Sequence, residues 1–270
     1  MKAGLVICGP DVAYGPLALL SGNFEKKIEK AARLGFQGVE LMVRNPVDLD
    51  WPKIKHTLDS AGLEVPQIVT GELFGADGLC LATSDLKVYQ RAEERTRTVI
   101  DLAAYLGAFV NIGRLRGRLE WLGNITNARD VAIERIRKIA EYAEQRGVRI
   151  TLEPINRYET DFLLTSKDGM QFVEELNCKN VGLMLDLFHM NIEEHSIEEG
   201  LSTAGGKLWH VHIADSNRNY PGSGHLAYTG VFQTLRQMNY RGYISAELRP
   251  LPDADTAAEK TIAFLKKWII

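Results

Sequence analysis

Short apolar runs rich in β-branched residues alternate with longer amphipathic runs eight times along this sequence, and each pair of runs spans about one strand and one helix. Such alternation of strands and helices is typical of a parallel sheet covered by helices, and the short apolar runs suit strands that are buried on both faces. The predicted strands are residues 2–8, 37–42, 65–70, 108–112, 148–153, 181–186, 208–213 and 243–247. The predicted helices are residues 24–34, 51–61, 87–106, 127–146, 167–176, 197–204, 231–238 and 255–268.

Glycines mark the ends of several predicted helices. Gly35, Gly62, Gly107 and Gly147 each stand between a helical run and the next apolar run. Glycine is favoured there because it enters the left-handed region without a steric penalty. The length of 270 residues is close to the roughly 250 that are typical of one (β/α)₈ barrel. The sequence therefore predicts an α/β fold in which a single TIM-barrel domain spans residues 1–270, although the strand count alone leaves an open doubly wound sheet possible.

Four polar residues stand at or next to the ends of the last four predicted strands. Glu153, Asp186 and Glu247 are the last residues of their strands, and His212 lies one residue before the end of its strand. In a closed barrel the carboxyl ends of the strands meet at one face, where enzymes of this architecture keep their active sites. Taken singly, each carboxylate could cap a helix or form an ion pair. Together, unpaired charges at one mouth are costly unless a cation or each other's protons neutralise them. Three carboxylates and one imidazole favour Mn²⁺, Mg²⁺ or Co²⁺ over a thiolate-rich structural zinc site.

Further polar residues follow the same strands. Glu159 lies six residues beyond Glu153, His189 lies three residues beyond Asp186, and Arg218 follows the seventh strand. All three are expected at the mouth, within reach of a polar substrate. His210 stands two residues before His212 and is expected to face the helices instead.

An arginine-rich segment follows the fourth predicted strand and carries Arg114, Arg116 and Arg118. Arginine suits bidentate binding of carboxylate or phosphate, so the segment either binds an anionic substrate or forms a solvated basic loop. Long segments at residues 71–86, 113–126 and 214–228 all follow strands and are expected to gather at the mouth, where they could close over a substrate.

Composition excludes several other classes of protein. The net charge of −3 and the pI of about 6.1 argue against a nucleic-acid-binding surface. No apolar run reaches the length of a membrane-spanning helix or of the apolar core of a signal peptide. The three cysteines are widely spaced and odd in number, which indicates free thiols in a reducing compartment and hence a cytoplasmic location.

Three segments carry a resemblance to a known family. They are EPINRYE at residues 153–159, DLFHMNIEE at 186–194 and HIADSNR at 212–218, and they are accompanied by Glu247. In combination they resemble the ketose 3-epimerases, the D-tagatose and D-psicose (allulose) 3-epimerase group of the xylose-isomerase-like TIM barrel superfamily. The similarity is strongest between residues 149 and 248.

The resemblance implies one divalent metal ion, with Mn²⁺ favoured over Co²⁺ or Mg²⁺, bound by Glu153, Asp186, His212 and Glu247. It implies that Glu153 and Glu247 are the catalytic acid/base pair and that Glu159, His189 and Arg218 hold the substrate. It also implies a homo-oligomer, either a dimer or a tetramer. The chemistry fits these residues, because inverting the carbon next to a carbonyl through a cis-enediolate needs two carboxylates, one to remove a proton and one to return it.

The substrate and the reaction remain open in part. The arginine-rich segment and PGSGH at residues 221–225 look closest to 5-keto-L-gluconate epimerase, so a keto sugar acid and a neutral ketose are equally favoured, ahead of a sugar phosphate. An aldose–ketose isomerase or an inosose dehydratase on the same barrel is the alternative, although the isomerase commonly needs a second metal and a lysine. A DNA-repair nuclease resembling endonuclease IV is disfavoured, because its three-zinc cluster is rich in histidine and this chain has six histidines.

Overall fold

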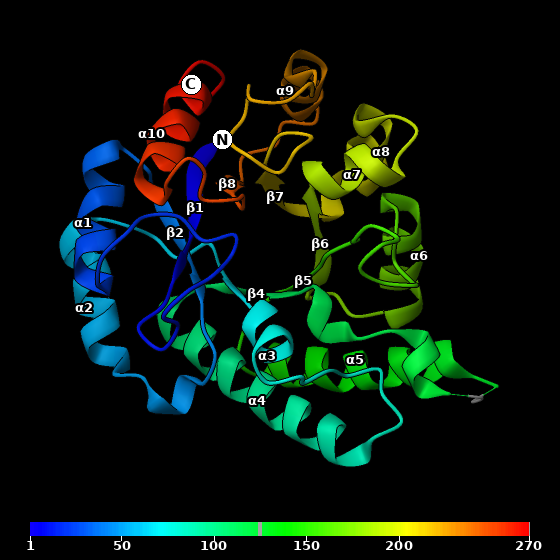
Figure 1. Ribbon diagram of the computed structural model, residues 1–270. Coiled ribbons are helices and arrows are strands. Elements are labelled where there is room, and N and C mark those ends of the chain that lie inside the picture. The colour runs from blue at the N-terminus through cyan, green and yellow to red at the C-terminus, as the bar shows by residue number, and fades with distance from the viewer. Residues whose placement is uncertain (124–125, 270) are drawn as a thin grey trace.

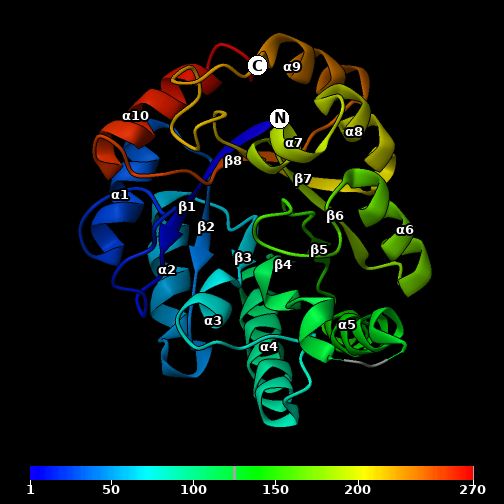
Figure 2. The same ribbon diagram turned by 45° about the vertical axis from the view of Figure 1, so that its right-hand side comes forward.

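Eight parallel strands pair in chain order, and the last pairs with the first, so that the sheet closes into a barrel. The computed structural model describes residues 1–123 and 126–269, and Figures 1 and 2 show the strands at the centre with helices around them. The predicted TIM barrel is thereby confirmed. The strands are β1 (Lys2–Cys8), β2 (Gly38–Met42), β3 (Gln67–Val69), β4 (Phe109–Ile112), β5 (Ile150–Leu152), β6 (Val181–Asp186), β7 (Leu208–Ile213) and β8 (Tyr243–Ala246).

Ten α-helices and four short 3₁₀ helices are present in the described residues. The predicted bounds of α1, α2 and α8 are confirmed. The short helix α3 lies inside a segment predicted as a loop, and the short helix α7 lies between a predicted strand and a predicted helix. The α-helices are α1 (Phe24–Leu34), α2 (Trp51–Ala61), α3 (Gly71–Gly75), α4 (Leu86–Leu106), α5 (Ala128–Gln145), α6 (Ser166–Leu176), α7 (Leu187–Glu193), α8 (Ile197–Ala204), α9 (Tyr228–Gln237) and α10 (Ala254–Leu265). The 3₁₀ helices are η1 (Pro46–Asp48), η2 (Arg114–Arg116), η3 (Leu119–Leu122) and η4 (Gly205–Lys207).

Local hydrogen bonds explain where the first helix begins and ends. The side chain of Asn23 accepts a hydrogen bond from the backbone N–H of Lys26 and so caps the first turn of α1. At the other end Gly35 adopts a φ of 92°, and its N–H donates to the carbonyls of Ala31 and Ala32. Glycine is needed at such a position because a side chain strains this backbone conformation. The helix therefore stops where β2 must begin.

The long segments after β3, β4 and β7 are ordered by short helices and buried side chains. The first contains α3, and the second contains η2 and η3. The second also includes Asn124 and Ile125, which lie outside the described residues. In the third, the buried carboxylate of Asp215 accepts hydrogen bonds from the backbone N–H groups of Ser216, Gly222 and Leu226 at 2.7, 2.7 and 3.1 Å. This carboxylate fixes the loop that carries Arg218.

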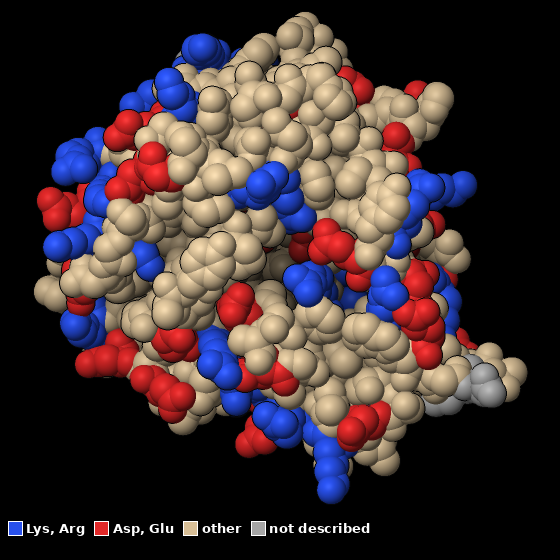
Figure 3. All heavy atoms as spheres, viewed as in Figure 1, with Lys and Arg blue, Asp and Glu red and all other residues tan. Residues whose placement is uncertain are grey.

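The surface in Figure 3 carries acidic and basic side chains side by side, and they border a hollow near the middle of this face. Charges of both signs on one face do not form the basic stripe that a nucleic-acid surface requires. None of the helices in the described part of the chain is long and apolar enough to cross a membrane.

Candidate metal centre and active site

Four side chains from successive strands converge at the carboxyl end of the barrel. Glu153 directly follows β5, Asp186 is the last residue of β6, His212 lies in β7, and Glu247 directly follows β8. One potential ligand atom from each lies within 4.8 Å of the corresponding atoms of the others. Asp186 and His212 are fully buried, and Glu153 is 6% exposed. The sequence placed these residues at strand ends, and the closed barrel brings them together.

The donor set fits a divalent cation. Asp186 Oδ2 and His212 Nδ1 are buried without a hydrogen-bond partner, although His212 Nδ1 lies 3.7 Å from Glu247 Oε2. Burial, together with repulsion from Glu247, raises the pKa of Glu153 to about 8. Burial also raises the pKa of Asp186 to about 6, against the opposing influence of Arg218. Polar atoms that lack partners and carboxyl groups that resist ionisation are both satisfied when one cation binds between them.

Glu247 differs from Glu153 in its surroundings. Burial favours its neutral form, but the positive charges of His212 and Arg218 outweigh burial and lower the pKa of Glu247 to about 2. Arg218 Nη2 lies 2.8 Å from Glu247 Oε2. Burial likewise lowers the pKa of His212, but Glu40 and Glu247 together raise it well above its usual value. The two glutamates at this mouth therefore have proton affinities that differ strongly.

His189 faces the same group of carboxylates. Its Nε2 lies 3.6 Å from Glu153 Oε1 and 3.7 Å from Asp186 Oδ2. The amide nitrogen of Asn156 lies 2.7 Å from His189 Nδ1 and 3.1 Å from Glu159 Oε1. Because this amide donates to Nδ1, the proton of a neutral imidazole resides on Nε2 and points into the site. Burial and nearby cations lower the pKa of His189 well below its usual value, so the neutral form prevails.

Arg218 reaches the site from the loop after β7. Its φ of 59° places it in the left-handed region, and its guanidinium lies 4.6 Å from the centre of the Phe188 ring. Besides Glu247, it approaches Asp186 Oδ2 at 3.5 Å and Glu159 Oε1 at 3.4 Å. Three carboxylates thus surround one half-buried cation. A cavity of about 430 Å³ opens above these groups, and its lining includes Arg114, Glu153, Glu159, His189, Arg218 and Glu247.

The three arginines of the segment after β4 have different surroundings. Arg114 is exposed, lines this cavity, and lies 4.6 Å from the centre of the Phe74 ring. Arg118 forms an ion pair with Glu120 and does not belong to the lining of the cavity. Arg116 is 1% exposed, and its two terminal nitrogens donate to four backbone carbonyls at 2.7–3.2 Å, including that of Glu153. The prediction that Arg116 binds an anionic substrate is therefore wrong, because main-chain oxygens already occupy its donors.

The expectation that His210 faces the helices is also wrong. Side chains two residues apart on a strand point to the same face, so His210 and His212 must share one side of β7. Both lie inside the barrel, where His210 Nε2 is 2.6 Å from Glu40 Oε1 and His212 Nε2 is 3.0 Å from Glu40 Oε2. Glu40 was not predicted from the sequence as a partner of these histidines. A carboxylate inside the otherwise apolar, fully buried run Gly38–Met42 was the available signal.

Comparisons with known proteins agree with this geometry. Residues 28–268 match the family model described as xylose isomerase-like TIM barrel. The L-ribulose 3-epimerase of Methylomonas sp. (strain DH-1) is 32% identical over 246 residues, which cover 87% of this chain and 83% of that protein. The 3-dehydro-D-guloside 4-epimerase of Escherichia coli (strain K12) is 35% identical over 51% of this chain and 53% of its own length.

A solved structure extends the comparison to the whole fold. The D-allulose 3-epimerase from Methylomonas sp. in complex with D-allulose superposes with a TM-score of 0.81 at 26% identity, covering 99% of this chain and 97% of that one. The match to the family model extends through the strands that carry the site. The chain therefore belongs to the xylose isomerase-like TIM barrel family and, within it, to the group of ketose 3-epimerases.

Proposed function

We propose that this protein is a divalent-cation-dependent isomerase that inverts the carbon next to the carbonyl group of a keto sugar or a keto sugar acid. The observation that carries the proposal is the meeting of Glu153 and Glu247 with Asp186 and His212 within 4.8 Å at one end of the barrel. Two carboxylates from strands that are separated by β6 and β7 can approach one carbon from different sides. The names of the relatives, which are epimerases of keto sugars, support the same chemistry.

The two glutamates act as a proton-transfer pair. The carbon next to a carbonyl is acidic enough for a carboxylate to remove its proton, and this leaves a planar enediolate. Inversion follows when the other glutamate, in its protonated form, returns a proton to the opposite face. Either glutamate can start the reaction, so the same pair serves both directions.

Neighbouring side chains bind and orient the sugar. Asp186, His212, Glu153 and Glu247 would hold the divalent cation, for which we favour Mn²⁺, and when bound it supplies Lewis acidity that polarises the carbonyl. Arg218 brings a positive charge beside the place where negative charge develops. His189 offers its Nε2–H as a donor to a substrate oxygen, and Glu159 accepts from a hydroxyl group.

Arg114 is the residue that bears on whether the substrate is charged or neutral. This side chain lines the active-site cavity, and no hydrogen bond or ion pair occupies its guanidinium among the described residues. We therefore retain a keto sugar acid beside a neutral ketose as substrate. Binding of a keto sugar acid would use Arg114 to hold the substrate carboxylate, whereas binding of a neutral ketose would not need this contact.

Epimerisation at another carbon is the second candidate, because one relative is named a 3-dehydro-D-guloside 4-epimerase. That name also describes inversion next to a ketone carbon, so the same pair of glutamates would suffice. An aldose–ketose isomerase is less favoured, since no lysine is among the described residues that line the cavity. A dimeric or tetrameric assembly and a cytoplasmic location stay predictions.

The test is to incubate the Mn²⁺-loaded protein in D₂O with neutral ketoses, keto sugar acids and 3-keto glycosides. We expect a pair of epimers with one deuterium at the inverted carbon of one substrate class. An aldose product would support the isomerase instead, and loss of water would support the dehydratase. If no substrate of the three classes exchanges a proton, the proposed function is contradicted.

A further inference from the structure

A layer of four buried polar side chains lies inside the barrel, on the side of His212 that faces away from the other cation ligands. It consists of Glu40, Gln67, Thr151 and His210. We propose that Glu40 and His210, which belong to this layer, are positioning residues that hold His212 in the orientation needed to bind the cation. The inference rests on the proposed cation site, and it concerns two residues that belong neither to that ligand set nor to the lining of the substrate cavity.

Glu40 is the hub of the layer. It lies in the middle of β2 and is 0% exposed, yet both of its oxygens are used. One oxygen is 2.6 Å from His210 Nε2. The other is 3.0 Å from His212 Nε2 and accepts a hydrogen bond from Gln67 Nε2 at 2.8 Å. A carboxylate in an apolar interior is stable only with such a complete set of donors.

These contacts define which nitrogen of His212 is free. Because Glu40 is an acceptor, the proton on Nε2 of His212 is committed to it, and a neutral imidazole then keeps its lone pair on Nδ1. That nitrogen is the buried atom without a hydrogen-bond partner, and it lies 3.7 Å from Glu247 Oε2, another of the proposed ligands. A carboxylate on the remote nitrogen of a metal-binding histidine fixes the tautomer and the ring orientation and makes the imidazole a stronger donor.

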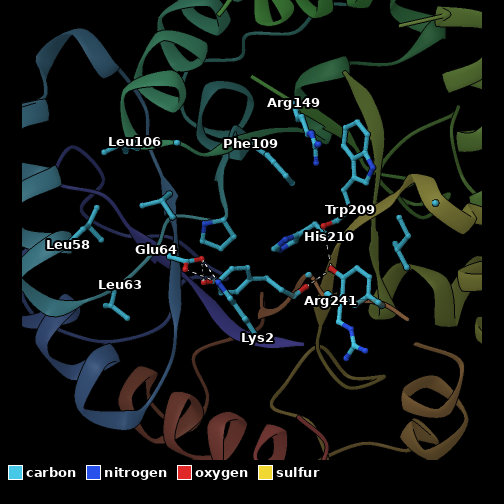
Figure 4. A pocket seen from close by; sticks show the side chains of 18 of the residues that line it. Lys2, Leu58, Leu63, Glu64, Leu106, Phe109, Arg149, Trp209, His210 and Arg241 are labelled. Atoms are coloured by element: carbon cyan, nitrogen blue, oxygen red, sulfur yellow. Dashed lines mark hydrogen bonds and ion pairs between the residues drawn. The ribbon is translucent and has the colours of Figure 1, made fainter. Parts of the chain in front are cut away.

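His210 holds Glu40 from the other side. Its bond to Oε1 of Glu40 prevents the carboxylate from rotating away from His212. The hydroxyl of Thr151 donates to the amide oxygen of Gln67 at 2.9 Å and makes no hydrogen bond to Glu40. His210 also lines a cavity of about 730 Å³ formed by residues at the amino ends of the strands, where Figure 4 shows it together with Arg149 and Trp209. Changes at His210 therefore leave the substrate cavity untouched.

The same three residues could instead form a second cation site, since Glu40, His210 and His212 also bring ligand atoms within 4.8 Å of one another. Their bonding argues against this. The two contacts between the imidazole rings and the Glu40 carboxylate already pair a donor with an acceptor, whereas the proposed cation site contains Asp186 Oδ2 and His212 Nδ1 without hydrogen-bond partners. Both oxygens of Glu40 thus have hydrogen-bond partners, whereas the cation site at the carboxyl end of the barrel contains buried polar atoms that have none.

The test measures binding of Mn²⁺ to the full-length chain after removal of bound metal, by titration calorimetry and elemental analysis. Loss of an outer carboxylate partner typically weakens metal affinity by about 10- to 100-fold. We expect a loss in that range for Glu40→Gln, a similar loss for His210→Phe, and partial recovery for His210→Gln, because glutamine still offers an N–H to Glu40. Thr151→Val is the matched control: it removes a buried hydroxyl from the same layer but touches Gln67 rather than Glu40, and its affinity should stay within about twofold.

A spectroscopic measurement separates positioning from general destabilisation. The visible absorption of bound Co²⁺ reports the geometry of its ligands, so Glu40→Gln and His210→Phe should change this spectrum while Thr151→Val should not. Circular dichroism establishes that each variant is folded. If Glu40→Gln does not fold, the comparison of His210→Phe with His210→Gln tests the proposal in its place.

Equal affinity for wild type, Glu40→Gln and His210→Phe would overturn the positioning role and leave the proposed function intact. Two ions per chain in the wild type, falling to one in Glu40→Gln, would overturn it in favour of a second cation site. A wild-type chain that binds no divalent cation would overturn the cation site and the proposed function together with this inference.

Discussion

Two neighbouring layers of the barrel interior contain similar residue types but differ in how their polar atoms are used. In the layer at the carboxyl end, Glu153 and Asp186 have raised pKa values, and atoms of Asp186 and His212 lack partners. In the layer beneath it, Glu40 accepts hydrogen bonds on both oxygens, and its pKa lies well below the usual value because the two histidines outweigh burial.

The difference teaches how to separate a working site from internal structure in this protein. Natural interiors pair nearly all of their buried polar groups, so a group of unpaired atoms indicates a ligand that completes it. Changes to groups that lack a partner should therefore reduce activity at little cost in stability. Changes to the paired groups should reduce stability, or act on the site indirectly.

The largest expected effect comes from the two glutamates. Glu153→Gln and Glu247→Gln should each lower kcat by about 10²–10⁴-fold, because a positioned acid or base contributes that much to a proton transfer. Glu153→Gln should not lower the melting temperature of the metal-free protein, since this group holds a proton up to about pH 8. Glu247→Gln should lower it, because it removes the ion pair with Arg218. Initial rates at saturating Mn²⁺, with metal content checked by elemental analysis, measure the first effect. A metal-loaded double variant that retains substantial activity would contradict the proton-transfer role.

Arg116 should show the opposite behaviour. Arg116→Met removes four hydrogen bonds to buried carbonyls, of which those of Gly113 and Leu163 keep a backbone donor. Each buried carbonyl left without a donor costs roughly 1–3 kcal/mol in the free energy of unfolding. Urea unfolding followed by circular dichroism measures this loss. Arg118→Ala in the same segment is the control, because its exposed ion pair with Glu120 contributes less than about 1 kcal/mol. Similar losses for the two variants would contradict the structural role of Arg116.

Arg114 distinguishes the two substrate classes. If the substrate is a keto sugar acid, Arg114→Ala removes a charge-assisted contact worth roughly 1.5–3 kcal/mol. The value of kcat/KM for tagaturonate should then fall by about one to two decades, while that for tagatose changes far less. Parallel assays of both sugars with the variant measure the difference. Equal losses on both, or none on either, would favour the neutral ketose.

The stability of the metal-free protein should depend on pH through Glu153. The folded chain holds a proton on this group up to about pH 8, whereas the unfolded chain releases it near its ordinary, lower pKa. The contribution of Glu153 to stability is therefore fully present below the ordinary pKa of glutamate and is lost as the pH rises towards about 8, by at most about 1.4 kcal/mol per pH unit for one proton. His212, whose pKa is also raised, acts in the same direction above its ordinary value.

Melting temperatures between pH 5 and pH 8, with and without a chelator, measure this dependence. Addition of Mn²⁺ should reverse the loss, because the cation replaces the protons. Glu153→Gln should flatten the slope in the metal-free protein. A metal-free wild type whose stability rises steadily over this range would show that Glu153 is already ionised.

The sequence was sufficient for the features that depend on local pattern. Glycine ends and amphipathic spacing predicted α1 and α2 at their observed bounds, and the positions of Glu153, Asp186, His212 and Glu247 at strand ends predicted their convergence once the barrel closes. The predicted bounds of β1, β6 and β7 were confirmed. The bounds of the other strands were wrong by one or two residues, as for β5, because the ladder of hydrogen bonds is shorter than the apolar run.

Features that depend on contacts between distant strands could not be predicted in the same way. Glu40 meets His210 and His212 across 170 and 172 residues of sequence, and no local pattern specifies that pairing. Arg116 looked like its neighbours Arg114 and Arg118, yet it turns inwards because the carbonyls of Glu153 and Phe162 surround it. Only the two-residue period of strands, applied to His210, would have placed that side chain correctly.

The most direct test of the difference between the two layers is a crystal structure of the Mn²⁺-soaked protein with anomalous data at the manganese edge. We predict one strong anomalous peak about 2.0–2.6 Å from ligand atoms of Glu153, Asp186, His212 and Glu247, with Glu40 and His210 still paired to each other. A peak bound by Glu40 and His210, or no peak at the carboxyl end of the barrel, would contradict the assignment of the incomplete layer as the cation site.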